Sequence, residues 1–206
     1  MKPIEEDPDV TRGDCYAVLA RLFLAPPDAA CLAALSAADA SAGSAQGALP
    51  DAWTLLGATA AQATPESAQL EYESLFVAVG RPQVVLYASW YLTGFMMEKP
   101  LAQLRDDLAA LGLARREGVS EPEDHIAALL EVMRHLVGDE SRSEDQRLAL
   151  QQRFFLAYID PWFVNLCDAV EAVDDVVLYR AAANFARAFL AVEKTFLGDE
   201  NKRYKQ

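Results

Sequence analysis

Apolar residues recur with the period of an α-helix along almost the whole chain. Near its start, Cys15, Val18, Leu19, Leu22 and Phe23 follow the i, i+3, i+4, i+7, i+8 spacing of an amphipathic helix. No segment shows strict alternation and no hairpin dipeptide lies between β-branched runs, although QVVLY could form a short strand. We therefore expect an all-α fold, a single globular domain over residues 1–206 with about nine or ten helices.

Proline, glycine and polar residues divide this pattern. The stretch APPD ends the first helix because proline cannot continue one. Thr64 and Pro65 predict the cap and the first turn of a later helix. Polar stretches at 38–50 and 138–145 indicate mobile loops, and the charged, Gly-bearing segment 113–122 indicates a hinge.

Two stretches differ from the amphipathic helices. Residues 84–97, VVLYASWYLTGFMM, are apolar nearly all round and predict a helix that is buried on several sides. From Gln146 onward the chain is rich in aromatic residues, and Pro161 within this run predicts a kink or a new helix.

The net charge of −13 disfavours some classes of partner. An acidic surface repels the phosphates of nucleic acids and anionic membranes, so we expect neither as a ligand. A basic partner, such as an arginine-bearing peptide, would instead be attracted. The charge could equally serve only to keep the protein soluble.

Targeting and redox features indicate a cytoplasmic protein. Cys15, Cys31 and Cys167 lie far apart without paired spacing, which fits a reducing compartment. The first ten residues are acidic and lack the apolar core of a secretory signal. No apolar run is long enough to cross a bilayer, so we expect no stable membrane insertion.

Motifs for catalysis, metals and nucleotides are absent from the sequence. His125 and His135 fall on almost opposite sides of one helix, and the chain has neither H-E-x-x-H nor C-x-x-C. It also has no G-x-x-x-x-G-K-[ST], G-x-G-x-x-G or G-x-S-x-G. We expect a protein that is not an enzyme and that holds no metal or cofactor.

The stretch SEPEDHIAALLEVM places an Asp–His pair at the start of an expected helix, 122–137. Ser120 and Glu123 fit a capping box, and the proline between them fits the first turn. Asp124 and its acidic neighbours meet the positive end of the helix dipole. His125 has no such explanation, and is either a buried, hydrogen-bonded neutral histidine or part of a binding site.

Three blocks of the chain resemble the TorD/DmsD family of cytoplasmic molybdoenzyme chaperones, which is related to the NarJ group. EYESLFVAVG (71–80) and LYASWYLTG (86–94) are similar to the family's E-Y-x-x-L-F and Y-x-S-x-Y-L blocks. EPEDHIAALLEVM (121–133) resembles its E-x-x-D-H hinge motif. QQRFFLAYIDPWFVNLCDAV (151–170) is similar to its F-x-x-x-H-x-x-x-W-x-x-x-F pattern, with Tyr158 where the family often has histidine.

The resemblance implies an all-helical protein that binds the twin-arginine signal peptide of a redox enzyme until the molybdenum cofactor is inserted. Residues of the three blocks would form the peptide-binding site. The groove would be lined by Tyr72, Leu75 and Phe76, and its neighbouring wall would consist of Tyr87, Ser89, Trp90 and Tyr91. Beside the groove, at the hinge, would lie Asp124 and His125. The same set of site residues includes Glu121 and Trp162. Each aromatic residue could equally belong to the core.

The implied partner is the precursor of a molybdenum-containing redox enzyme, bound through its signal peptide, its apo form or both. Two alternatives stay open at this point. One is an assembly chaperone for a non-exported redox-enzyme subunit, and the other is a nucleotide-binding switch with a site at His125. The hinge would allow a monomer or a domain-swapped dimer.

Overall fold

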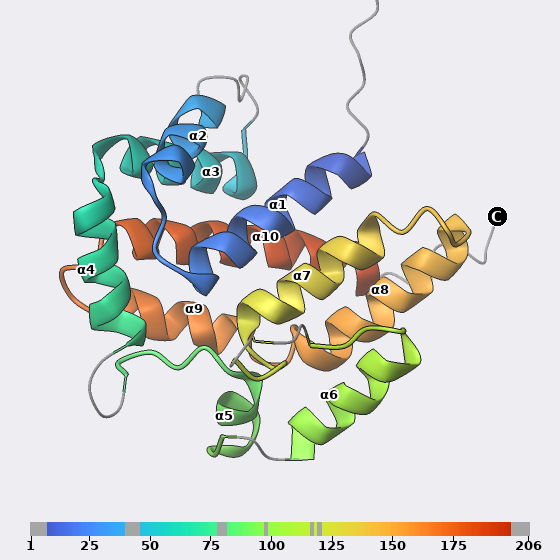
Figure 1. Ribbon diagram of the computed structural model, residues 1–206. Helices are drawn as coiled ribbons and strands as arrows, with labels where there is room; N and C mark the ends of the chain where they lie inside the picture. Colours follow the sequence, from blue (N-terminus) through green and yellow to red (C-terminus); the bar gives the residue numbers. More distant parts are fainter. Residues whose placement is uncertain are drawn as a thin grey trace, which may run out of the picture. The chain divides into compact units, whose positions relative to one another are not determined.

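The computed structural model describes residues 8–39, 46–77, 82–96, 99–115, 118 and 121–198, which form ten helices and no strand within these ranges (Figure 1). The all-α prediction is confirmed. The helices are α1 (Pro8–Leu24), α2 (Ala29–Asp39), α3 (Ala48–Gln62), α4 (Pro65–Phe76), α5 (Ala88–Thr93), α6 (Lys99–Ala110), α7 (Ile126–Val137), α8 (Glu144–Tyr158), α9 (Phe163–Glu171) and α10 (Leu178–Gly198).

Backbone contacts divide the chain into two compact units. The first unit consists of Met1–Ala20, Tyr87–Pro161 and Lys194–Gln206, and the second of Arg21–Leu86 and Trp162–Glu193. Helices α5 to α8 belong to the first unit, and α2, α3, α4 and α9 to the second, while α1 and α10 contribute residues to both. That the whole chain acts as one domain stays a prediction.

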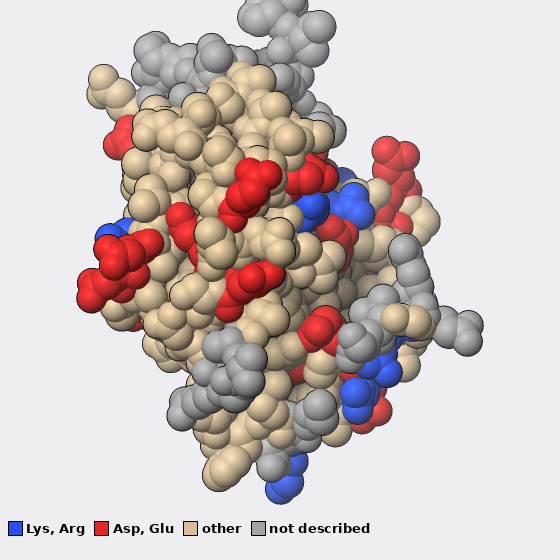
Figure 2. Space-filling model, turned by 60° about the vertical axis from the view of Figure 1, so that its left-hand side comes forward, with Lys and Arg blue, Asp and Glu red and all other residues tan. Residues whose placement is uncertain are grey.

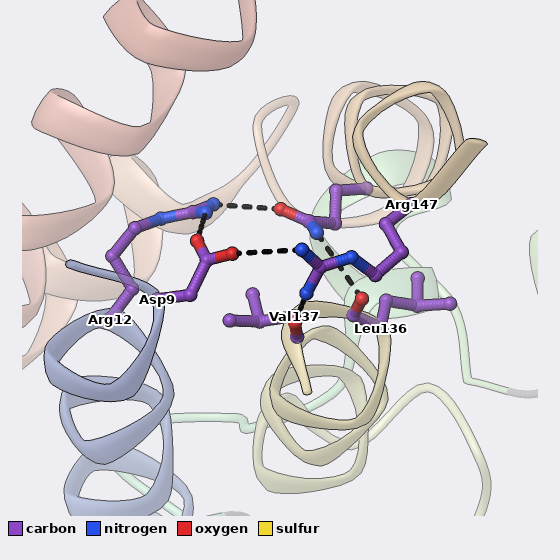
Figure 3. A network of polar contacts seen from close by, with 6 residues as sticks. Asp9, Arg12, Leu136, Val137 and Arg147 are labelled. Atoms are coloured by element: carbon purple, nitrogen blue, oxygen red, sulfur yellow. Dashed lines mark hydrogen bonds and ion pairs between the residues drawn. The ribbon is translucent and has the colours of Figure 1, made fainter. Parts of the chain in front are cut away.

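A network of charged and amide side chains connects α1, α7 and α8 in the first unit (Figure 3). Asp9 pairs with Arg12 at 2.9 Å and with Arg147 at 3.3 Å, and Arg12 donates to Gln151 at 2.9 Å. Arg147 and Gln151 donate to the last two carbonyls of α7, at 2.7 and 3.2 Å. These carbonyls lack donors within their own helix, so the network satisfies the end of α7.

The start of α4 in the second unit follows the sequence prediction. The side chain of Thr64 accepts from the backbone N–H of Ser67 at 3.2 Å, and the Ser67 hydroxyl accepts from the N–H of Thr64 at 3.0 Å. Pro65 occupies the first position, where its missing N–H costs nothing. This capping box confirms the predicted helix start.

The prediction of one buried helix over 84–97 is wrong. Only Ala88–Thr93 are helical, and residues 84–87 are not. Gly94, with a φ of 80°, takes the left-handed conformation that ends the helix. Three large apolar side chains that we expected to be buried, namely Leu92, Phe95 and Met96, are exposed.

The helix expected over 122–137 begins instead at Ile126, with His125 as its N-cap. The partner expected for Glu123, Ser120, lies outside the described residues, as does part of the predicted hinge 113–122, which stays a prediction. Pro161 marks a new helix rather than a kink, because α8 ends at Tyr158 and α9 begins two residues after the proline.

The loop expected over 38–50 is shorter than predicted. Helix α2 continues through Asp39 and α3 already begins at Ala48, which leaves Gln46 and Gly47 as its described residues. The loop expected over 138–145 ends two residues early, because Ser143 caps α8 with a hydrogen bond from the N–H of Gln146.

Candidate functional site

Asp124 holds the start of α5 in the first unit. Its Oδ2 accepts hydrogen bonds from the backbone N–H of Ser89 at 3.0 Å and from the Ser89 hydroxyl at 2.6 Å. Its carbonyl accepts from the N–H of Ala88 at 3.0 Å. Tyr87, the N-cap residue of α5, gives that helix no side-chain cap, so the carboxylate of Asp124 takes this role from a distant part of the chain.

His125 caps α7. Its Nδ1 accepts a hydrogen bond from the backbone N–H of Ala127 at 3.1 Å. The ring meets the Tyr87 ring edge to face, with 5.1 Å between centroids, and the backbones of these two residues form an isolated antiparallel bridge. Burial lowers the pKa of His125 from its ordinary value, although Glu121 and Asp124 act in the opposite direction. The ring is therefore neutral at neutral pH, with its proton on Nε2.

Two glutamates precede the Asp–His pair in the sequence. The hydroxyl of Tyr87 donates to a carboxylate oxygen of the half-buried Glu121. Glu123 pairs with Arg105 at 2.9 Å and with Arg115 at 3.8 Å. Partial burial would raise the pKa of Glu123, but the hydrogen bond and charge of Arg105 and the charge of Arg115 outweigh it and lower this pKa. The negative charge of Glu123 is thus paired with two arginines, whereas the carboxylate of Glu121 accepts from the Tyr87 hydroxyl.

The cluster keeps unused hydrogen-bonding capacity. Among the described residues, Asp124 Oδ1 is buried and accepts no hydrogen bond. The hydrogen bond of the His125 ring uses Nδ1 only, which leaves the Nε2 proton for another acceptor. A buried polar atom without a partner is uncommon and indicates a place where a ligand group could bind.

The predicted peptide-binding residues separate into two groups. The first unit brings together Tyr87, Ser89, Glu121, Asp124 and His125, with Trp90 and Tyr91 partly exposed on the same short helix as Ser89. The second unit holds Tyr72, Leu75, Phe76 and Trp162.

Packing accounts for the group in the second unit. The hydroxyl of Tyr72 donates to the carbonyls of Phe23 and Leu24 at the end of α1, at 3.3 and 2.9 Å. Leu75 is fully buried, and the ring of Phe76 meets the ring of Tyr72 edge to face. Trp162 is also buried. Their role in lining a groove stays a prediction.

Glu71, beside Tyr72, has a structural role that the sequence did not suggest. Its carboxylate accepts from the backbone N–H groups of Val177, Leu178 and Tyr179 at 3.2 to 3.3 Å. It therefore caps α10 with a negative charge at the positive end of the helix dipole. In the sequence, Glu71 is distinguished only as the first residue of the block EYESLFVAVG, which resembles a family motif. That position does not indicate that Glu71 caps α10.

Tyr158, which stands where the resembling family often has histidine, connects two helices of the first unit. Its hydroxyl donates to Asp107 on α6, and Arg153 pairs with the other oxygen of that carboxylate at 2.8 Å. Burial and the contact with Asp107 raise the pKa of Tyr158 far above its ordinary value. The residue is a fixed neutral donor rather than a titrating group.

The described part of the chain offers no cluster of three or more His, Cys, Asp or Glu side chains that could bind a metal ion. In the same part of the chain, none of the helices has the length and apolar character needed to cross a membrane.

Comparison with known proteins gives the geometry a context. Residues 42–168 match the family described as nitrate reductase delta subunit. The chain is 31% identical over 150 residues to the chaperone protein TorD of Photobacterium profundum, covering 66% of this chain and 69% of the relative. It is 32% identical over 144 residues to TorD of Vibrio cholerae, covering 65% and 66%. The matches therefore span about two thirds of each relative.

A solved structure shares the fold. The crystal structure described as a redox enzyme maturation protein from Archaeoglobus fulgidus aligns with a TM-score of 0.56 and 23% identity. The alignment covers 89% of this chain and 93% of that protein. At this level of identity the likeness supports the helical architecture and carries no residue roles.

Proposed function

This chain belongs to the nitrate reductase delta subunit family, and from that premise we propose that it is a cytoplasmic maturation chaperone for a molybdenum-containing redox enzyme. It binds the twin-arginine signal peptide or the apo form of the precursor. It holds this precursor for cofactor insertion before export. It catalyses no reaction and needs no cofactor of its own.

The observation that carries this proposal is the pair of unused polar atoms at Asp124 and His125. A guanidinium group presents several N–H donors in one plane, and carboxylate oxygens are its best partners. Asp124 Oδ1 and the carboxylate of Glu121 supply such oxygens within one cluster. The Nε2 proton of His125 can donate to a carbonyl of the peptide backbone.

A guanidinium reaches Asp124 Oδ1 only after a rearrangement that opens the site, because this atom is buried. Leaving a buried charged oxygen unsatisfied is costly, so a donor that satisfies it favours the open arrangement. The site therefore favours a cationic ligand over a neutral one.

The charge of the surface supports the same ligand. Figure 2 shows several patches of Asp and Glu and few Lys and Arg on one face of the molecule. With a net charge of −13, the chain attracts a cationic peptide and accelerates the encounter.

A second candidate is an assembly chaperone that binds a non-exported redox-enzyme subunit. The description of the matched family, a nitrate reductase subunit, supports it. This role would use a folded or partly folded surface of the client and would not depend on an arginine pair.

A binding measurement tests the proposal. The probe is a fluorescein-labelled synthetic peptide with an Arg-Arg pair followed by an apolar stretch, compared by anisotropy with the same peptide carrying Lys-Lys. We expect Asp124→Asn to weaken binding of the Arg-Arg peptide about tenfold, since it removes the charge while keeping the size of the side chain. Glu131→Gln, on the exposed face of α7, is the matched control and should bind like the wild type.

Circular dichroism confirms that each variant is folded before its affinity is compared. Equal binding of both peptides by the wild type, or no binding at all, would contradict signal-peptide recognition. Capture of an apo subunit that lacks an arginine pair would then support the second candidate.

A further inference from the structure

Helix α5 and the turn that follows it expose a set of large apolar and aromatic side chains. Within α5 only Ala88 and Ser89 are buried. The side chains that remain partly or largely exposed, here called the α5 lip, are Trp90, Tyr91, Leu92, Phe95 and Met96. Phe95 is 68% exposed, and Leu92 and Met96 are each 39% exposed. A cluster of this kind on a soluble protein usually marks an interaction site.

The exposed turn is fixed by hydrogen bonds. Gly94, in a left-handed conformation, donates from its N–H to the carbonyl of Trp90 at 2.8 Å. The Thr93 hydroxyl donates to the carbonyl of Ser89 at 2.8 Å and accepts from the N–H of Phe95 at 3.2 Å. The exposure of Phe95 is therefore part of an ordered turn that the backbone holds in place.

The two ends of α5 differ in chemical character. At the N-terminal end of α5, Tyr87 donates to the carboxylate of Glu121 and Ser89 donates to that of Asp124. The C-terminal end of α5 carries the exposed apolar side chains. Six helical residues span about 9 Å, so the acidic and apolar ends are close enough for one short peptide to reach both.

We propose that the α5 lip binds the apolar stretch that directly follows a pair of basic residues in the ligand peptide, while the acidic end of α5 binds the basic pair. This inference rests on the proposed function and adds a direction and a spacing to it. An extended chain advances about 3.3 Å per residue, so the first apolar side chain to reach the lip lies roughly three residues after the basic pair. The occupant has a cationic end and an apolar end, in the order that matches α5.

Two synthetic peptides and two variants test this inference. One fluorescein-labelled peptide carries Arg-Arg followed by a Leu/Ala stretch, and the other carries Arg-Arg followed by a Ser/Gln stretch of equal length. Phe95→Ser should lose about tenfold in affinity for the apolar peptide, because an aromatic side chain can no longer be buried, and should bind the polar peptide as the wild type does. Leu70→Ser is the matched control, since Leu70 is 69% exposed on α4, and should change neither affinity.

The outcomes separate the two proposals. If the wild type binds neither peptide, the proposed recognition of a signal peptide fails, and this inference with it. If the wild type binds the apolar peptide and Phe95→Ser binds it equally well, the proposed function stands and the role of the lip is wrong. Loss of a dimer in Phe95→Ser, measured by light scattering, would show that a second copy of the chain covers the lip and would also overturn the inference.

Discussion

Asp124 and His125 are neighbours in sequence but stabilise two different helices. Asp124 supplies the cap of α5 through Ser89, and His125 supplies the cap of α7 through its own ring. Each residue also keeps one polar group that its structural role does not use, and these are the groups that we assign to the ligand. In the proposed function, the pair combines its structural role with a recognition role.

Replacing His125 tests its capping role. His125→Ala should lower the free energy of unfolding by about 1 kcal/mol, because the N–H of Ala127 loses its acceptor. His125→Asn should retain most of the stability, since asparagine is a good N-cap residue. Urea unfolding monitored by circular dichroism measures both. Equal stability of the Ala variant and the wild type would contradict the cap.

The same residue predicts a pH dependence. Because burial lowers the pKa of His125 below its ordinary value of 6.5, the unfolded chain takes up the proton first as the pH falls. The stability contributed by the neutral ring is complete above pH 6.5 and decreases as the pH falls below it. Unfolding midpoints at about pH 7.5 and pH 5.5 should therefore differ less in His125→Asn than in the wild type.

The exposed histidine of the same helix provides the control for this measurement. His135→Asn should preserve the difference between the two pH values. An identical difference in His125→Asn and the wild type would mean that other groups account for the pH dependence.

Tyr72 distinguishes a packing role from a groove role. Tyr72→Phe removes the hydrogen bonds to the end of α1 and should lower the free energy of unfolding by about 1 kcal/mol. The aromatic ring is retained in this variant. If Tyr72 has only a packing role, the affinity for the Arg-Arg peptide should therefore be unchanged. Lower affinity without a loss of stability would place the hydroxyl of Tyr72 in the binding site instead.

At the level of helices, the sequence predicted most elements because their signals are local. The capping box at Thr64 and the apolar period of α7 need no distant partner to be recognised. The two main errors, at α5 and at the start of α7, have different causes. The start of α5 depends on Asp124, which is far from Ser89 in sequence and meets it only in the fold, whereas α7 begins where the ring of His125 caps it.

The residues of the candidate site follow from sequence motifs, but their geometry does not. Burial of Tyr72 and Leu75 depends on contacts with distant helices, which an apolar pattern does not specify. The exposure of Phe95 depends on Gly94 ending α5, and an apolar stretch in this position indicated the opposite.

The polar network at the end of α7 connects three helices of the first unit, α1, α7 and α8, and should therefore stabilise this unit. Gln151→Leu should lower the free energy of unfolding by about 1–3 kcal/mol, because it removes the donor to the Leu136 carbonyl and the acceptor for Arg12. Gln69→Leu, which removes an exposed contact with Glu73, should cost less than about 0.5 kcal/mol. Thermal unfolding of both variants provides the comparison, and equal midpoints would contradict the importance of the network.

The molecule combines an acidic net charge, a helical fold and a buried carboxylate oxygen at Asp124 that accepts no hydrogen bond within the described residues. None of these features alone identifies a chaperone. Their agreement with the family to which the chain belongs supports recognition of a cationic, partly apolar ligand. The chain would then act by binding and release.

Capture of the natural partner tests this account most directly. Tagged wild-type protein is isolated from its native cells beside Asp124→Asn and the control Glu131→Gln, and mass spectrometry identifies what each retains. We expect the wild type and the control to retain a molybdenum enzyme precursor that lacks its cofactor and keeps its twin-arginine signal, and Asp124→Asn to retain much less. Equal retention by all three proteins, or a partner without such a signal, would contradict the account.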